Sequence, residues 1–128
     1  MAIFTHVCVG TNDLQRASKF YDASLGALGV NNLGPMGATG ILYGAGAPEF
    51  LVTKPGNGLP STYGNGGTLG FAAPNRAAVR QFHEAGLANG GKCEGAPGPR
   101  SFTPTAYAAY LRDPDGNKIC AYCFQDGE

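Results

Sequence analysis

The sequence predicts an α+β fold made of two similar halves, each with the order strand, helix, three strands. The main observation is an internal repeat. Residues 11–29 and 73–91 align without a gap, so that Phe20 falls on Phe82 and Gly29 on Gly91. Both copies show the apolar periodicity of a helix. In addition, 21 glycines in 128 residues mostly end short apolar segments, as expected for strands joined by tight turns.

The first half opens with a strand at residues 4–10, followed by a helix. The apolar residues of this helix recur at steps of three and four between Leu14 and Leu28. Asn12 is expected to cap the helix, with Gln15 as the second member of a capping box. Gly29 is expected to end it in the left-handed conformation. Short strands are predicted at residues 40–45 and 49–54.

The second half repeats this order, with a strand at residues 67–73 and a helix that Asn75 caps and Gly90 ends. Strands at 106–112 and 118–124 are joined by DPDGN, in which Gly116 can take the positive φ of a hairpin turn. Residues 31–39 and 92–105 have a weaker strand pattern, so we expect them to be more mobile. The chain is thus predicted to be one domain, 1–128, with modules at about 1–55 and 67–124.

Charge and composition exclude several classes of partner. Nine basic and nine acidic residues give a formal net charge of zero, so no basic surface is expected to attract nucleic acid. The sequence contains no polybasic run, no long apolar segment and no secretion signal, so we expect no membrane association. The simplest interpretation is a cytoplasmic protein whose thiols are reduced.

Three segments carry a resemblance to a known family: HVCVGTNDLQRASKFYDASLGALGV, GTLGFAAPNRAAVRQFHEAGLANGG and YAAYLRDPDGNKICAYC. Together they resemble the vicinal oxygen chelate superfamily, which includes glyoxalase I, bleomycin-resistance proteins and extradiol dioxygenases. RDPDGN followed by an apolar strand is the most specific part. The resemblance implies two βαβββ modules that form a curled mixed β-sheet around a central cleft.

In catalytic relatives, a divalent metal such as Zn, Ni, Mn or Fe lies in the cleft. Side chains from the first and last strands of each module hold it. The resemblance places His6 at the first of these positions. It places Thr68 where relatives often have His, and Cys120 where they usually have Glu. The fourth position falls near Leu51, and Glu49 is the nearest acid. The expected ligands at 68 and 120 are therefore replaced, and Thr is a poor ligand for Zn or Fe.

The C-x-x-C spacing of Cys120 and Cys123 does not predict a metal or redox motif. Residues three apart in a strand point to opposite faces, so the two thiols cannot hold one ion. We interpret them as small apolar residues of a strand. A set of His6, Cys8 and Cys120 facing the cleft is an alternative that would suit Zn or Cu(I). His83 lies in the middle of a helix, and we expect it to be a surface or half-buried residue.

The sequence and the resemblance leave two functions open. The first is a member with a degraded metal site that binds a small organic molecule in the cleft as a homodimer, with no catalytic residue assigned. The alternative is a metal-dependent lyase or dioxygenase that uses His6 with Cys120 or Glu49. Arg100 could hold an anionic group and Tyr107 could stack on a ligand. The full set of candidate ligand-binding residues is Arg100, Tyr107, Phe50, Thr68 and Tyr122.

Overall fold

The computed structural model describes residues 3–128 and contains two helices and eight strands in the predicted order. The first module consists of β1 (Val7–Gly10), α1 (Leu14–Gly26), β2 (Asn31–Met36), β3 (Gly40–Gly44) and β4 (Phe50–Thr53). The second consists of β5 (Leu69–Ala72), α2 (Arg76–Ala88), β6 (Lys92–Pro99), β7 (Ala106–Arg112) and β8 (Lys118–Phe124). Neither helix is long and apolar enough to cross a membrane.

The strands form two mixed four-stranded sheets, ordered β1-β4-β3-β2 and β5-β8-β7-β6. In each module the first strand pairs in parallel with the last, and the other pairs are antiparallel. The modules also share a register, because Cys8 lies beside Leu51 and Gly70 lies beside Cys120. The structure therefore confirms the α+β fold of two βαβββ modules.

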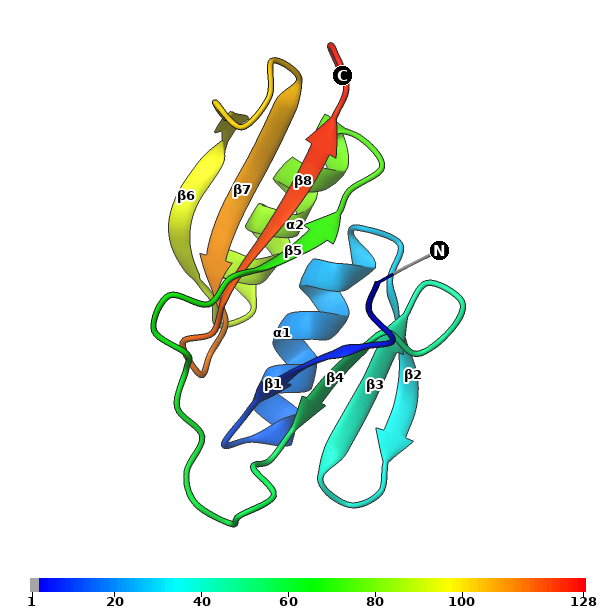
Figure 1. Cartoon of the computed structure of the whole chain (residues 1–128), viewed down its shortest axis with the longest axis vertical. Coiled ribbons are helices and arrows are strands. Elements are labelled where there is room, and N and C mark those ends of the chain that lie inside the picture. Colours follow the sequence, from blue (N-terminus) through cyan, green and yellow to red (C-terminus); the bar gives the residue numbers. More distant parts are fainter. Residues whose placement is uncertain (1–2) are drawn as a thin grey trace.

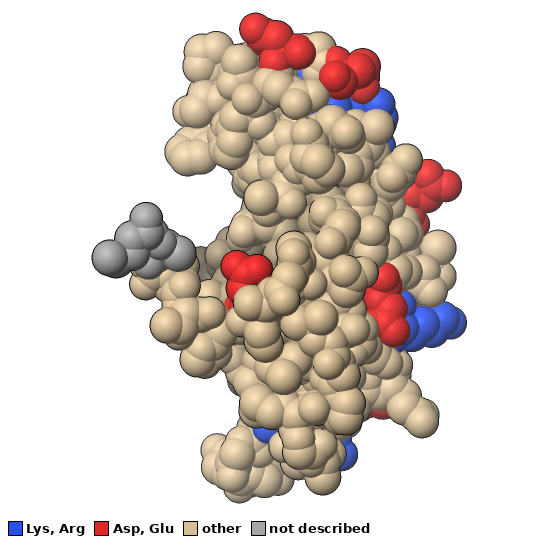
Figure 2. Space-filling view, turned by 90° about the vertical axis from the view of Figure 1, so that its right-hand side faces the viewer, with Lys and Arg blue, Asp and Glu red and all other residues tan. Residues whose placement is uncertain are grey.

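Both helices cover the same side of the two sheets, and the opposite sheet faces are left open (Figure 1). Helices α1 and α2 pack against each other, and each also packs on the sheet of its own module. Apolar side chains from the helices and the covered sheet faces form one core. In profile the molecule has a hollow on the other side, and most visible charged side chains lie away from it (Figure 2).

The helix ends agree with the sequence prediction except at one residue. The N-cap of α1 is Asp13, whose carboxylate accepts a hydrogen bond from the Arg16 N–H, so the prediction of Asn12 was wrong by one position. The side chain of Asn12 instead accepts from the Ser61 N–H and donates to the Ser61 carbonyl. Asn75 caps α2 as predicted. Gly29 has a φ of 84°, which a residue with a side chain rarely adopts.

The two segments with a weak strand pattern are strands, β2 and β6. Each pairs with the neighbouring strand through an irregular register, with a shift between Asn32 and Gly34 in β2 and two shifts between Cys93 and Gly98 in β6. Both are edge strands of their sheets. Such bulges interrupt the alternation of side chains, which explains why the pattern of the sequence was weak there.

The β7–β8 turn joins the two modules through polar contacts. Asp115 accepts hydrogen bonds from the Thr11 hydroxyl at 2.6 Å and the Asn12 N–H at 2.9 Å, at the start of α1. The Tyr21 hydroxyl of α1 donates to the buried Asp113 at 2.5 Å. Asn117 donates to the Gly10 carbonyl at the end of β1. These contacts fix the second module against the first.

Candidate functional site

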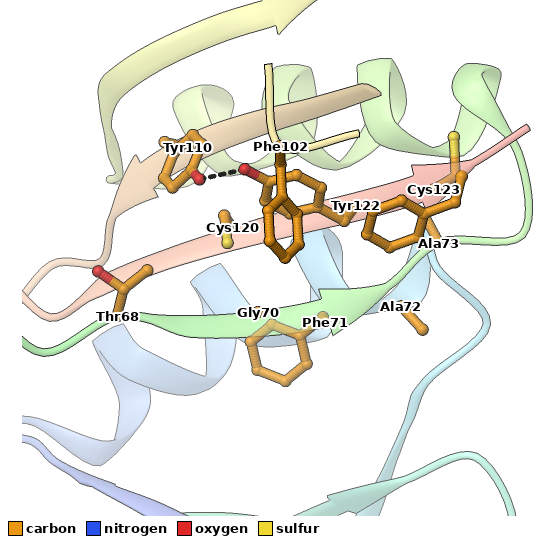
Figure 3. Close-up of a pocket in the computed structure, with 11 residues that line it drawn as sticks. Thr68, Gly70, Phe71, Ala72, Ala73, Phe102, Tyr110, Cys120, Tyr122 and Cys123 are labelled. Carbon is orange, nitrogen blue, oxygen red and sulfur yellow. Dashed lines mark hydrogen bonds between the residues drawn. The ribbon is translucent and has the colours of Figure 1, made fainter. Parts of the chain in front are cut away.

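The main candidate site lies on the open face of the second module (Figure 3). It is a cavity of about 630 Å³ between β5, β7, β8 and the loop that carries Phe102. We call it the aromatic cavity. Its lining residues are Thr68, Gly70, Phe71, Ala72, Ala73, Phe102, Tyr110, Cys120, Tyr122, Cys123 and Phe124. All of them have uncharged side chains.

Strand alternation positions the wall that β8 contributes. Ile119 and Ala121 point to the core beneath the helices, so Cys120, Tyr122 and Phe124 point to the open face. Cys123 packs in the core but also borders the cavity at the end of the strand. One face of β8 therefore packs in the core, and the other face lines the aromatic cavity.

Three aromatic rings form a partly exposed cluster at the cavity mouth. Tyr122 and Phe124 are stacked, with centroids 5.6 Å apart and an interplanar angle of 16°. Phe102 packs edge-on against both, at 6.0 Å from each. Phe102 is 72% exposed and Phe124 is 53% exposed. Much aromatic surface thus remains available to a ligand.

Two hydroxyl groups supply the directional polar feature of the cavity. The hydroxyl oxygens of Tyr110 and Tyr122 lie 2.5 Å apart (Figure 3). Burial, followed by this hydrogen bond, raises the pKa of Tyr110. Beside them, burial raises the pKa of the Cys120 thiol to about 11. Both groups are therefore neutral near pH 7, and the Cys120 sulfur is a thiol rather than a thiolate.

A second cavity, of about 500 Å³, lies between the modules, and we call it the intermodule cavity. Its lining includes His6 before β1, Glu49 before β4 and the β5 residues Gly70 and Phe71. His6 and Glu49 also line a smaller neighbouring cavity of about 220 Å³. The Thr5 hydroxyl lies 3.0 Å from Nδ1 of His6. His6 and Glu49 thus line the same cavities, because they precede β1 and β4, which are neighbouring parallel strands.

The predicted metal-site residues divide between the two cavities. Thr68 borders both, His6 and Glu49 line the intermodule cavity but not the aromatic cavity, and Cys120 lines the aromatic cavity but not the intermodule cavity. Cys8 borders a third cavity, of about 280 Å³, that Thr68 also lines. Within residues 3–128, no group of three or more His, Cys, Asp or Glu side chains is placed to hold an ion. The donor set therefore does not fit the metal that the resemblance implies.

Only some of the predicted ligand-binding residues line the aromatic cavity. Tyr122 and Thr68 line the aromatic cavity, and Phe50 lines the intermodule cavity while also packing in the core. Arg100 borders neither cavity. Its guanidinium donates to the carbonyls of residues 96, 98 and 99 and stacks over the Tyr110 ring. These hydrogen bonds hold the Arg100 guanidinium against the ring of Tyr110, which lines the aromatic cavity.

Tyr107 lies on the opposite side of β7 from the aromatic cavity. It packs in the core with the guanidinium of Arg76 4.8 Å from its ring centroid, and its hydroxyl accepts from Arg80. Tyr110, which was not among the predicted binding residues, takes the cavity-facing position instead. The register of the β7–β8 hairpin indicates which tyrosine of β7 faces the cavity. It places residue 110 opposite Cys120, and therefore on the same face as Tyr122.

Comparison with known proteins gives one strong family match. The family model of the Glyoxalase/Bleomycin resistance protein/Dioxygenase superfamily matches residues 3–121. The crystal structure of a glyoxalase/bleomycin resistance protein from Albidiferax ferrireducens T118 is 52% identical, with a TM-score of 0.85. The match covers 94% of this chain and 98% of that one. A search of curated proteins gave no match.

More distant structures share the fold. Lactoylglutathione lyase from Agrobacterium tumefaciens is 22% identical, with a TM-score of 0.63 over 94% of this chain and 92% of that one. A glyoxalase/bleomycin resistance protein/dioxygenase family enzyme from Burkholderia phytofirmans PsJN is 18% identical, with a TM-score of 0.72. That match covers 97% of this chain and 100% of the other.

Proposed function

Because the chain belongs to the glyoxalase/bleomycin resistance protein/dioxygenase superfamily, we propose that it binds a small, uncharged, aromatic molecule in the aromatic cavity. The observation that carries the proposal is the lining, which combines three clustered rings with no charged side chain. The volume of about 630 Å³ is typical of small-molecule sites. A charged ligand would lose its hydration there without gaining an ionic partner.

The tyrosine pair adds a requirement for one polar group on the ligand. When one hydroxyl of Tyr110 and Tyr122 donates to the other, one O–H hydrogen remains free, and so do oxygen lone pairs. A phenol or a similar neutral group can therefore be bound at this end, while its ring contacts Phe102. The proposal requires no metal ion.

A matched pair of probes tests this proposal. We expect 2-naphthol to bind with a micromolar Kd in protein-observed NMR titrations, and 2-naphthoate, its charged analogue, to bind at least about tenfold more weakly. Phe102→Ala should weaken naphthol binding by about fivefold, since it removes an aromatic contact. Leu59→Ala, an exposed apolar residue in the loop between the modules, is the control and should bind like the wild type. Equal affinity for the two probes, or no binding of either, would contradict the proposal.

The alternative is a metal-dependent lyase or dioxygenase that uses His6 with Glu49 or Cys120. The observation in its favour is that His6 and Glu49 share two cavities. Two donors hold a catalytic metal far more weakly than the three protein ligands usual for such sites. The proposal of a metal-independent binder is therefore preferred.

Metal content separates these two functions. We expect protein purified without chelator to contain far less than one equivalent of Zn, Ni, Mn or Fe by elemental analysis, even after incubation with each ion. His6→Ala should then change nothing. Near-stoichiometric metal in the wild type that disappears in His6→Ala would support the enzyme instead.

We also propose, from the family, that the protein is a cytoplasmic homodimer. Its four cysteines are all free, which suits a reducing compartment. Ile3, Phe4, Phe102 and Phe124 present exposed apolar surface that a second subunit could cover. Light scattering on the purified protein would measure the oligomeric state.

A further inference from the structure

Cys93 and His83 lie in contact on the side of the second module that faces away from the aromatic cavity. Cys93 is paired with Leu111 in the β6–β7 ladder, and Leu111 points to the core beneath the helices. The Cys93 side chain therefore faces α2, where His83 occupies the middle of the helix. The two atoms, Sγ of Cys93 and Nε2 of His83, are 3.1 Å apart.

The two partners differ in exposure in a way that suits a reactive thiol. His83 is only 9% exposed, so packing fixes its ring. Cys93 is exposed and lies on β6, an edge strand of its sheet. The register shift that follows Cys93 locally interrupts the ladder and leaves the thiol beside the helix. A small molecule can therefore reach the sulfur while the imidazole stays in place.

We propose that Cys93 and His83 form a reactive thiol–imidazole pair, at which Cys93 is covalently modified by small soft electrophiles. The sulfur forms a bond to the electrophilic carbon, and the leaving group departs with the electron pair of its own bond to that carbon. The thiol proton moves to Nε2 of His83 and then to water. A thiol gains nucleophilicity when a base is positioned in this way.

The state of His83 agrees with this role. Burial lowers the pKa of His83, which favours the neutral ring, and in the tautomer with the proton on Nδ1 the Nε2 atom is the acceptor that faces the Cys93 thiol. Cys8 provides an internal comparison because it is also an exposed thiol, but within residues 3–128 its sulfur hydrogen-bonds to the Val9 carbonyl, at 3.7 Å, and not to an imidazole. Cys120 and Cys123 are buried. One chain thus contains an exposed thiol with an imidazole and an exposed thiol without one.

Site-resolved alkylation tests the proposal in the wild-type protein. Iodoacetamide is added at pH 7.4 for increasing times, the remaining thiols are labelled with the isotopically heavy reagent in urea, and each cysteine is quantified by mass spectrometry. We expect Cys93 to react about fivefold or more faster in the folded protein than in urea, where the imidazole contact is lost. Cys8 should react no faster when folded. A Cys93 rate in the folded protein equal to or below that in urea would overturn the proposal.

Variants assign the effect to the imidazole. His83→Gln should lower the folded rate of Cys93 to about its rate in urea, while Glu84→Gln, an exposed neighbour on α2, should leave it unchanged. Circular dichroism checks that both variants are folded. An unchanged Cys93 rate in folded His83→Gln would also overturn the proposal. If His83→Gln fails to fold, the comparison of folded and urea-treated wild type still decides.

Discussion

At position 120, where the family resemblance implied an acidic ligand, this chain has a thiol, and the surroundings keep that thiol neutral. Cys120 is 3% exposed, between Tyr110 on β7 and Gly70 on β5. Burial raises its pKa, and the nearby Tyr110 hydroxyl, Lys118 and Arg100 only partly oppose the effect. A neutral thiol agrees with the uncharged ligand that we propose for this cavity, whereas a carboxylate would need a cation.

The raised pKa predicts how Cys120 titrates. In difference spectra between the wild type and Cys120→Ala, thiolate absorbance near 240 nm should appear with a midpoint at about pH 11. The pKa of Cys120 is higher in the folded state than in the unfolded state. The contribution of the neutral thiol to the free energy of unfolding is therefore fully present below the unfolded-state pKa. This stabilisation is lost as pH rises through the folded pKa. A thiolate that already forms below pH 8 would show that the site is more polar than the structure indicates.

The alternation of side chains along a strand determines which residues of β7 and β8 face the aromatic cavity. Residues 107 and 110 are three apart in β7 and so lie on opposite faces. The same rule separates Cys120 from Cys123 on β8, and on β7 it places Tyr110, not Tyr107, beside Tyr122. Arg100 could not be placed from the sequence, because its position depends on backbone carbonyls in an irregular part of β6 and the residues beside it.

At the scale of elements, the repeat was the most informative feature of the sequence. The spacing of 62 residues that relates the two helices also relates Cys8 to Gly70, whereas their strand partners Leu51 and Cys120 are 69 residues apart, because the connections between the helix and the last strand differ in length. Elements with regular periodicity were therefore predicted well. The edge strands β2 and β6 were not, because glycine, proline and register shifts disturb their alternation. The repeated order of strand, helix and three strands predicted a strand in each segment, and the pairing with β3 and β7 gives their bounds.

The contact between Cys93 and His83 illustrates what no periodicity reveals. The two residues are on different elements, α2 and β6, and their approach depends on the helix packing over an edge strand. The sequence predicts each element but not the rotation of the helix relative to the strand. A contact between two side chains at this distance therefore had to come from the structure.

At the scale of the whole molecule, the two modules are held by the β7–β8 turn as well as by the core. The side chain of Asp115 is 1% exposed and contacts the Thr11 hydroxyl, the Asn12 N–H and Arg16. These groups begin α1, so a short turn of the second module completes the polar contacts of the first. The hollow shared by the modules depends on this docking, because β1 and β5 belong to different sheets.

Removing this contact should destabilise the whole chain. Asp115→Ala leaves the Asn12 N–H without its acceptor and removes the nearer acceptor of the Thr11 hydroxyl, which keeps the Asp13 carbonyl at 3.1 Å, so we expect a loss of about 2 kcal/mol in the free energy of unfolding. Urea unfolding followed by circular dichroism measures this loss. Asp126→Ala, at an exposed acid in the C-terminal segment, is the matched control and should change stability by less than about 0.5 kcal/mol. Equal stability of the two variants would mean that Asp115 contributes no net free energy to the docking of the modules, which would then depend on the core and on the contacts of Asp113 and Asn117.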